Sequence, residues 1–225
     1  MKSNTLFTKA IFAFVVLMFA TTISQAQFNV KVGYRLAILD TDGVNASIRA
    51  YNDQTNIGQD SRAGIRFLNG LDLGIRYKLR GLAFEAGVFA VNSTQDLYGT
   101  LDFDESLQAS LRNFYAGVDF KYRGIGIGTH IGSQRLRYQA ALGGLNDRFE
   151  IYKETQIAHQ IHLIFEHASE NIAFSLRPYV SYALSPYNLN EVDKALFTSG
   201  TTPASEFDND LLIFGLTLTF YNGAQ

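Results

Sequence analysis

The sequence contains no cysteine and no tryptophan, and it has only three prolines in 225 residues. Without cysteine the chain can form neither disulfide bonds nor thiolate metal sites. The formal net charge is only −2, so the composition gives no reason to expect a nucleic-acid partner. Glycine, tyrosine and phenylalanine are abundant, which favours strands, tight turns and aromatic packing over helices.

Long apolar runs are also missing, except near the N-terminus. Lys2 and Lys9 lead into an apolar stretch over residues 10–20, and the residues that end at Ala26 form a small-x-small cleavage site. This pattern predicts a secretory signal peptide over residues 1–26, cleaved before Gln27, and one mature domain over residues 27–225. An uncleaved anchor helix is the alternative, but the apolar stretch is short for a membrane span.

The rest of the chain is dominated by apolar residues at every second position. From Phe28 to Ile38 apolar side chains alternate with polar residues or glycine. Similar alternation recurs over residues 65–79, 82–90, 114–122, 125–131, 157–165, 172–184 and 212–220. Each segment has roughly the length of a tilted transmembrane strand. A soluble β-sandwich also alternates, so periodicity alone does not distinguish the two architectures.

The links between these segments alternate between long and short. Those over residues 39–62, 92–111, 135–154 and 185–210 are long and polar, whereas Arg80-Gly81, Arg123-Gly124 and about four residues around Ser169 are short. Outer-membrane barrels have long external loops and short periplasmic turns. The sequence therefore predicts an all-β fold, an eight-stranded antiparallel transmembrane up-and-down β-barrel with both chain ends on the periplasmic side.

Two hairpins look like copies of each other, residues 73–84 and 116–127. A two-residue turn makes Leu79 face Leu82 and Tyr122 face Ile125, all on the lipid side. An aromatic girdle is predicted near the periplasmic ends, formed by Phe28, Tyr77, Phe120, Tyr122, Phe165, Phe220 and Tyr221.

The last predicted strand, Gly-Leu-Thr-Leu-Thr-Phe at residues 215–220, resembles the C-terminal recognition signal of bacterial outer-membrane barrels, although five more residues follow it. The signal peptide is similar to those of Bacteroidota envelope proteins. The chain as a whole resembles the small outer-membrane β-barrel family that includes PorT-like and OmpX-like proteins. This resemblance implies residence in the outer membrane of a Gram-negative bacterium, insertion by the barrel assembly machinery and contact with lipopolysaccharide. It carries over no functional residue.

Charged residues recur at the inward positions of the predicted strands. They are Lys31, Arg35, Arg66, Asp72, Arg76, Lys78, Glu85, Asp119, Lys121, Glu166 and Arg177. The interior of an eight-stranded barrel is just wide enough for its own side chains, and buried charges must be paired. We therefore expect a plug of paired charges that does not conduct, with a narrow pore or binding cavity as the alternative.

The predicted interior polar cluster consists of Arg76, Glu85, Asp119, His130, His162, Glu166 and Arg177. Arg76 should form an ion pair with Glu85 across the first short turn. Antiparallel pairing should place His130 near His162, with a possible slip of two residues. Arg177 should lie on the other side of His162, and Asp119 or Glu166 should compensate charge. The neighbouring arginine disfavours a protonated imidazole, so we expect a neutral His162.

We predict no metal site, no cofactor and no catalytic residue. His159 and His162 point to opposite faces of one strand and cannot chelate together. Ser175 with His162 is the only inward pair that could resemble a nucleophile and its base, and it lies where a lipid chain would not reach. Acidic residues in the links at 96–105 and 191–210 could bind divalent cations or a partner protein.

The sequence thus predicts a non-catalytic outer-membrane protein with a structural or surface-binding role. One alternative is an accessory component of protein secretion or envelope assembly, as the PorT-like resemblance implies. A second is a lipid-modifying acyl hydrolase.

Overall fold

A computed structural model describes residues 26–39, 44–46, 48, 65–98, 104–141, 147–169, 172–190, 192, 194 and 211–222. The predicted signal peptide lies outside these residues, apart from the backbone of Ala26. The strands are β1 (Ala26–Leu39), β2 (Phe67–Leu79), β3 (Leu82–Tyr98), β4 (Asp104–Tyr122), β5 (Ile125–Ala141), β6 (Phe149–Ala168), β7 (Ile172–Ala183) and β8 (Leu212–Asn222).

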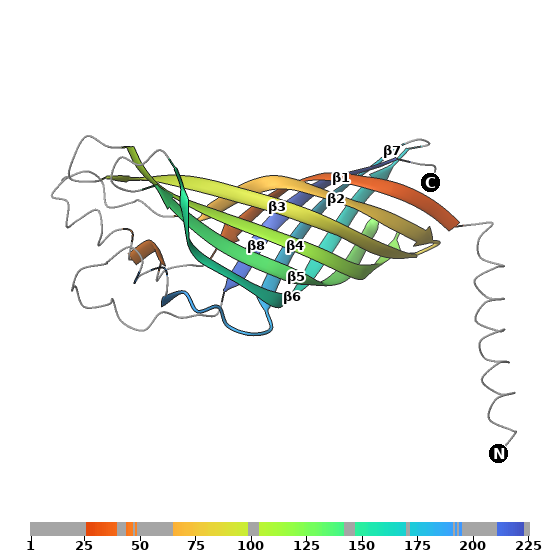
Figure 1. The fold of residues 1–225 in the computed structure, drawn as a ribbon. Coiled ribbons are helices and arrows are strands. Elements are labelled where there is room, and N and C mark those ends of the chain that lie inside the picture. Colours follow the sequence, from red (N-terminus) through yellow and green to blue (C-terminus); the bar gives the residue numbers. More distant parts are fainter. Residues whose placement is uncertain are drawn as a thin grey trace, which may run out of the picture.

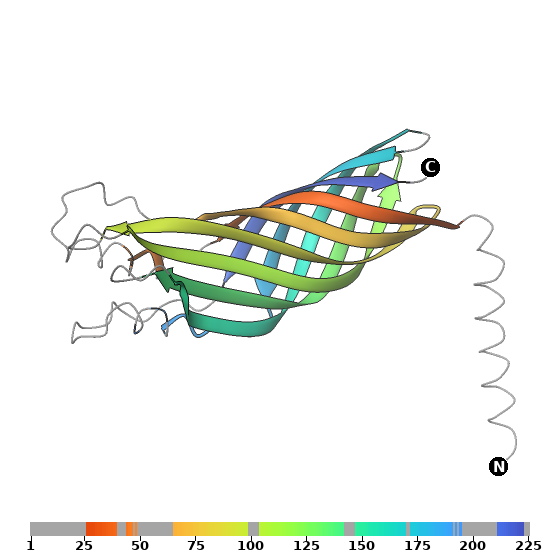
Figure 2. The same ribbon diagram turned by 45° about the horizontal axis from the view of Figure 1, so that its top comes forward.

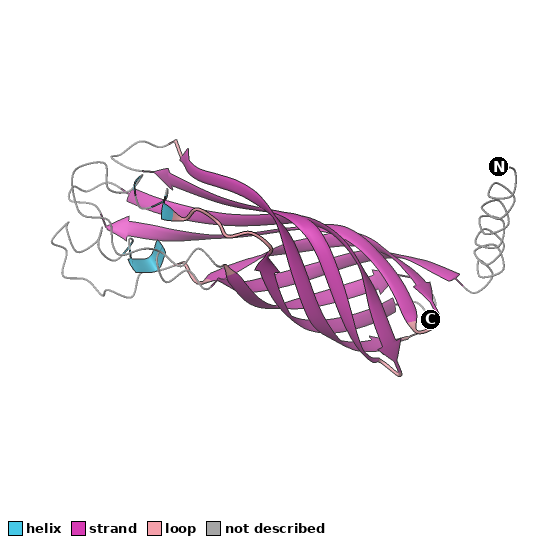
Figure 3. Cartoon of the chain, turned by 90° about the horizontal axis from the view of Figure 1, so that it is seen from below, coloured by secondary structure: helices cyan, strands magenta, loops and turns pink. Residues whose placement is uncertain are grey.

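These strands form a closed barrel in which each strand pairs antiparallel with its neighbours in the sequence, and β8 pairs with β1 (Figure 1). The strands are tilted relative to the barrel axis, as closure of a sheet into a barrel requires (Figure 3). The prediction of an eight-stranded antiparallel up-and-down barrel is confirmed. None of the helices in the described part of the chain is long and apolar enough to cross a membrane.

The outer wall of the barrel is apolar over most of its height. The outward positions of β1, from Phe28 to Ile38, keep 41–63% of their surface exposed. Equivalent positions on the other strands include Phe114, Ile125 and Ile157, which are 68%, 64% and 49% exposed. We call this ring of outward apolar side chains the apolar belt. Contact between apolar surface and water is unfavourable, and soluble proteins therefore rarely expose contiguous apolar patches. A belt that surrounds the whole molecule needs an apolar environment.

Four strands extend well beyond the belt. β3, β4, β5 and β6 have 17, 19, 17 and 20 residues, whereas β7 and β8 have 12 and 11 (Figure 2). The prediction of long loops over 92–111 and 135–154 is therefore wrong, because most of these residues are strand. The links over 39–62 and 185–210 lie largely outside the described residues.

The reason for this error is a change of pattern along the strands. Beyond the belt the outward positions become polar, as at Asn92, Arg112 and Thr155. The inward positions stay apolar, as at Leu107 and Leu136, both fully buried. The extensions thus alternate as strands of a soluble sheet do, with apolar residues inside and polar residues outside.

The short turns are confirmed. Arg80 and Arg123 adopt φ angles of 52° and 50°, and Gly124 has φ 85°. Positive φ angles at the centre of two-residue hairpin loops match the twist of the flanking strands. As predicted, the register pairs Leu79 with Leu82 and Tyr122 with Ile125.

The aromatic girdle is correct except for one member. Phe28, Phe120, Tyr122, Phe165 and Phe220 are 45–74% exposed on the outer wall. Tyr221 is instead 1% exposed and lies inside the barrel. The reason is the two-residue period of a strand: since Phe220 faces outward, its neighbour must face inward.

Candidate functional site

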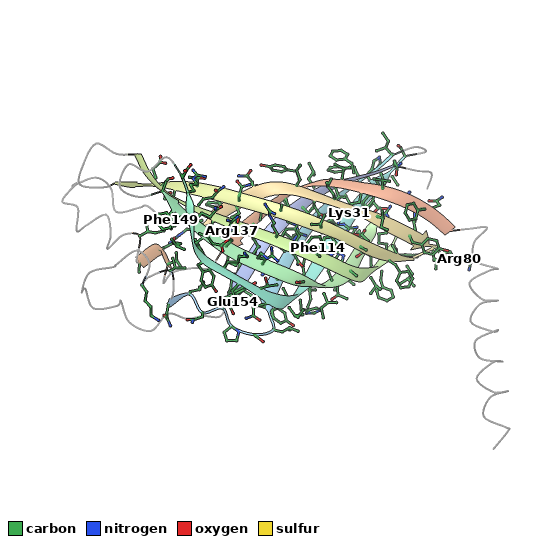
Figure 4. All side chains as sticks on the ribbon, viewed as in Figure 1. Lys31, Arg80, Phe114, Arg137, Phe149 and Glu154 are labelled. Atoms are coloured by element: carbon green, nitrogen blue, oxygen red, sulfur yellow. The ribbon has the colours of Figure 1, made fainter. Side chains whose placement is uncertain are left out.

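The interior of the barrel is filled in two layers. Near the short turns it contains paired charges, among them Lys31, which is 1% exposed and is labelled in Figure 4. Nearer the long links it contains an apolar layer, formed among others by Leu68, Leu107, Leu111, Leu136, Tyr138, Ile48, Tyr187, Leu189 and Ile213, each at most 2% exposed. Paired charges thus fill one part of the lumen, as expected, and apolar side chains fill the other.

Nearly all of the inward charges predicted from sequence lie in the lumen. Seven of them are at most 3% exposed: Lys31, Arg35, Asp72, Arg76, Glu85, Asp119 and Arg177. The side chains of Lys121 and Glu166 are 6% and 4% exposed, and Lys78 is half-buried at the rim. Arg66 is the exception. It is exposed just before β2 begins, so its predicted inward position is wrong.

Glu85 is the centre of the charged layer. Arg177 donates hydrogen bonds from Nη1 to Oε2 at 2.9 Å and from Nη2 to Oε1 at 2.8 Å. The hydroxyl of Tyr221 donates to Oε1 at 2.9 Å, and Lys31 Nζ lies 3.2 Å from Oε2. Two cations and a hydroxyl thus compensate one carboxylate, as a dry interior requires.

The predicted ion pair between Arg76 and Glu85 is wrong, although the two residues are register partners as expected. Arg76 Nη1 instead donates to Glu166 Oε2 at 2.6 Å, and Lys121 Nζ donates to Glu166 Oε1 at 2.6 Å. The guanidinium of Arg76 also lies 3.6 Å from the ring centroid of Tyr221. In a narrow closed barrel a long side chain reaches strands that are not its neighbours, so the direct register partner is not the only candidate.

The two histidines lie together, as predicted. The ring centroids of His130 and His162 are 4.5 Å apart, and His162 Nε2 lies 2.9 Å from Asp119 Oδ1 in a hydrogen bond. The register pairs His162 with Gly128 and His130 with Gln160, a slip of two residues that the prediction allowed. Arg177 is bound to Asp119 at 2.8 Å, so Asp119 and not Glu166 compensates charge here.

His130 is held by packing alone among the described residues. Its ring stacks on Tyr115 at 4.6 Å, and neither ring nitrogen has a hydrogen-bond partner there. Its Nε2 atom is 3.7 Å from Glu85 Oε2 and 3.9 Å from Asp119 Oδ1, too far for hydrogen bonds.

Metal binding and catalysis are the two chemical uses to test against this geometry. Asp119, His130 and His162 each offer one ligand atom, and these atoms lie within 4.8 Å of one another. Lys31 and Arg177 lie among the same groups and already neutralise Glu85 and Asp119, so a divalent cation would add charge to a balanced cluster. We therefore assign no metal to it.

Ser175 and His162 do not form a nucleophile–base pair. Arg177 Nε donates to Ser175 Oγ at 3.1 Å, while His162 is bonded to Asp119. A nucleophilic serine needs a base within hydrogen-bond reach, and this serine has an arginine there instead.

Sequence reasoning missed the tyrosines that complete the polar layer. Tyr115 accepts a hydrogen bond from Lys31 at 2.7 Å and donates one to Asp72 at 2.6 Å. Tyr179 and Phe89 flank the guanidinium of Arg35, with ring centroids 4.4 and 3.8 Å away. Strand parity would have found Tyr115, because it lies four residues from Asp119 on the same face.

A groove of about 680 Å³ opens on the outer wall near Pro178. Its lining is apolar and includes Leu36, Ile161 and Phe214, all members of the belt. The paired rungs between β6 and β7 are interrupted at Pro178, which has no amide hydrogen to donate. Two residues of the interior, His162 and Tyr179, also belong to its lining.

Taken together, the belt, the closed strand order and the filled lumen define a small eight-stranded barrel of the outer-membrane type. No protein-family model matches the sequence, and no curated protein matches it.

Solved structures share the fold. Ail, the attachment invasion locus protein of Yersinia pestis in complex with the heparin analogue sucrose octasulfate, has a TM-score of 0.53 at 10% identity, over 88% of this chain and 97% of that one. Neisserial surface protein A has a TM-score of 0.42 at 11% identity, over 88% of this chain and 97% of that one. At such identities the likeness concerns the fold, and of these two only Ail has a TM-score above 0.5.

Proposed function

We propose that the chain is an integral outer-membrane barrel without catalysis, which has a structural or surface-binding role and whose lumen does not conduct. The observation that carries this proposal is the inside-out distribution of side chains. A continuous apolar belt surrounds a core of paired charges, and this arrangement is stable only if the belt faces lipid. Export by a cleaved signal peptide over residues 1–26 and insertion by the barrel assembly machinery belong to the same proposal.

The filled lumen supports a role outside the barrel. Buried charges occupy one end of the described lumen and apolar side chains the other, which supports a barrel that does not conduct. The binding surfaces that remain are the outer wall and the external strand extensions. Lipopolysaccharide and an envelope protein are the partners that such surfaces would meet.

An accessory role in secretion or envelope assembly, as in PorT-like proteins, is the second candidate. It is favoured by the tall extensions of β3 to β6, which offer a polar wall to another protein. Co-purification of secretion components from outer membranes would support it.

Arginine substitutions test the membrane placement. Leu73→Arg puts a charge in the belt, and Asn92→Arg puts the same charge outward beyond it. We expect the first to destabilise the barrel in bilayers by about 2–4 kcal/mol and the second to change stability by less than about 1 kcal/mol. The readout is urea unfolding in phosphatidylcholine vesicles. Equal effects of the two variants would contradict the placement, as would recovery of the protein from the soluble periplasm.

A further inference from the structure

The outward face of the extended strands β4 to β6 carries a cluster of positive charge. Its members are Arg112, Arg135, Arg137 and Lys153 on these strands, together with Arg148 just before β6 begins. All but Arg137 are exposed, and the side chain of Arg137 is 36% exposed. We call this cluster the basic wall. Apart from Arg112, its members fall in the segment 135–154 that the sequence pattern assigned to a loop. The alternation Arg135-Leu136-Arg137 is the signal that would have revealed a strand with a basic outer face.

The strand register arranges the wall in two rows. Arg112 pairs with Arg135, and Arg135 with Thr155 on the next strand. One outward rung further from the belt, Ser110 pairs with Arg137, and Arg137 with Lys153. Partners in adjacent strands lie about 5 Å apart, so three cationic groups fall within reach of one phosphate-sized anion.

The wall begins where the apolar belt ends. The rung below the first row pairs Phe114 with Ser133, and Ser133 with Ile157. Beyond Phe114 the next two outward residues of β4 are Arg112 and Ser110, and beyond Ile157 those of β6 are Thr155 and Lys153. Two residues of strand separate successive outward rungs by about 7 Å. Figure 4 labels Phe114 on the barrel and Arg137 nearer the long links. In the proposed membrane placement, the basic side chains thus lie at the height at which lipid headgroups begin.

The charge of the wall is poorly balanced by its own residues. Arg112, Arg135, Arg137, Lys153, Ser110 and Glu150 line a groove of about 130 Å³, in which Glu150 is the one carboxylate. Glu150 lies 2.7 Å from Arg137 Nε and 3.5 Å from Lys153 Nζ. Arg112 forms no ion pair with any residue that the structure describes, and Arg148 donates to the neutral side chains of Gln108 and Ser106. Adjacent arginines repel each other unless an anion lies between them.

We propose that the basic wall binds the phosphate groups of a phosphorylated glycolipid in the outer leaflet, of the lipid A type. The wall points sideways from the barrel toward the surrounding lipid headgroups, and it starts one rung above the belt, so its natural ligand is anchored in the same leaflet. Guanidinium groups bind phosphate oxygens in a bidentate manner, which suits a wall made mostly of arginine. This inference depends on the proposed outer-membrane placement and adds a lipid site to it.

The test is a titration of the full-length mature chain with bisphosphorylated lipid A, followed by native mass spectrometry from detergent micelles. The variant Arg112→Gln/Arg135→Gln removes two charges from the first row. The matched control Arg80→Asn/Arg123→Asn removes two charges from the short turns, where asparagine tolerates the positive φ angles. We expect the wall variant to weaken lipid A binding about tenfold and the control to leave it within about twofold of wild type. Inorganic phosphate should not displace the lipid.

Three outcomes would overturn the inference. In the first, the wall variant binds lipid A as tightly as wild type. In the second, both variants lose the same affinity, which would indicate unspecific attraction. In the third, sucrose octasulfate binds and lipid A does not, which would assign the wall to a soluble polyanion.

A second measurement separates these outcomes from a failure of the proposed function. The same samples are reconstituted into vesicles, and the migration of the unboiled protein on gels reports whether the barrel has inserted. A chain that never inserts contradicts the membrane placement itself, whereas an inserted barrel that ignores lipid A contradicts the lipid site alone.

Discussion

Gly128 lies directly opposite His162 in the register of β5 and β6, and the missing side chain of Gly128 makes room for the imidazole. A Cβ atom at this position would overlap Asp119 Oδ1 and His162 Nε2. The glycine therefore allows the hydrogen bond between His162 and Asp119 to form in the core of the barrel.

Gly128→Ala is expected to separate this pair and to destabilise the barrel by about 1–3 kcal/mol, the usual cost of overpacking a filled interior. Urea unfolding in lipid vesicles measures the loss. Gly33→Ala is the matched control, because its added Cβ would meet no atom closer than 3.0 Å. A larger effect at Gly33 than at Gly128 would show that the hydrogen bond between His162 and Asp119 does not depend on the missing side chain of Gly128.

The ion pairs around Glu85 should contribute far more to stability than those on the surface. Glu85→Gln leaves Arg177 and Lys31 buried with less compensating charge, and we expect a loss of about 3–5 kcal/mol in the free energy of unfolding. Glu150→Gln removes an exposed partner of Arg137, and a loss of at most about 1 kcal/mol is expected. If the two variants were equally stable, the charged layer would not be part of the folding core.

The two layers of the lumen lead us to expect no conduction. Planar bilayers that contain the purified barrel should show no stable channel, even at high salt. Because apolar packing closes one end independently, Arg177→Met should also remain closed, provided that it folds. Reproducible steps of about a nanosiemens in the wild type would contradict a filled lumen.

Acid should loosen the segment that follows β7. Burial alone would raise the pKa of Glu154, but hydrogen bonds from Tyr152, from the amide of Asn188 and from Gln156 outweigh it and lower the pKa below its ordinary value. A lowered pKa means that this stabilisation is fully present above the ordinary glutamate pKa of about 4.3 and is lost as the pH falls through the folded value.

Hydrogen exchange can follow this loss at Asn188, once the rates are corrected for their intrinsic pH dependence. Protection should fall between neutral pH and about pH 3 in the wild type. In Glu154→Gln, which has no charge to lose, protection should already be low at pH 7 and change little with pH. Glu150→Gln serves as the control and should behave as the wild type does. An identical pH profile in Glu154→Gln would exclude this carboxylate as the cause.

The sequence pattern identified the membrane-facing part of each strand but not the strand ends. At Phe114 and Ile157 the outward residues are apolar. The two-residue period is visible there, and the strand prediction is accurate. Beyond them the outward residues are polar, as at Arg112 and Thr155, and the segment resembles a loop unless its inward residues are read separately.

Side-chain partners were harder to predict than strand register. The pairing of Arg76 with Glu85 in register was predictable from the two-residue turn, yet Arg76 binds Glu166 on β6. Register follows from local geometry, whereas partner choice in a closed barrel depends on which side chains meet across the lumen. The contact between His130 and His162 was predictable because the two residues lie on adjacent strands, where the register alone brings their side chains together.

The unequal strand lengths also give the barrel a direction within the plane of the membrane. In the proposed membrane placement β3 to β6 rise above the lipid, while β7 and β8 end near the edge of the belt. A molecule that diffuses past one flank meets a tall polar wall, and on the opposite flank it meets little more than hydrocarbon. Neighbouring proteins and lipids would therefore encounter two different sides of one cylinder.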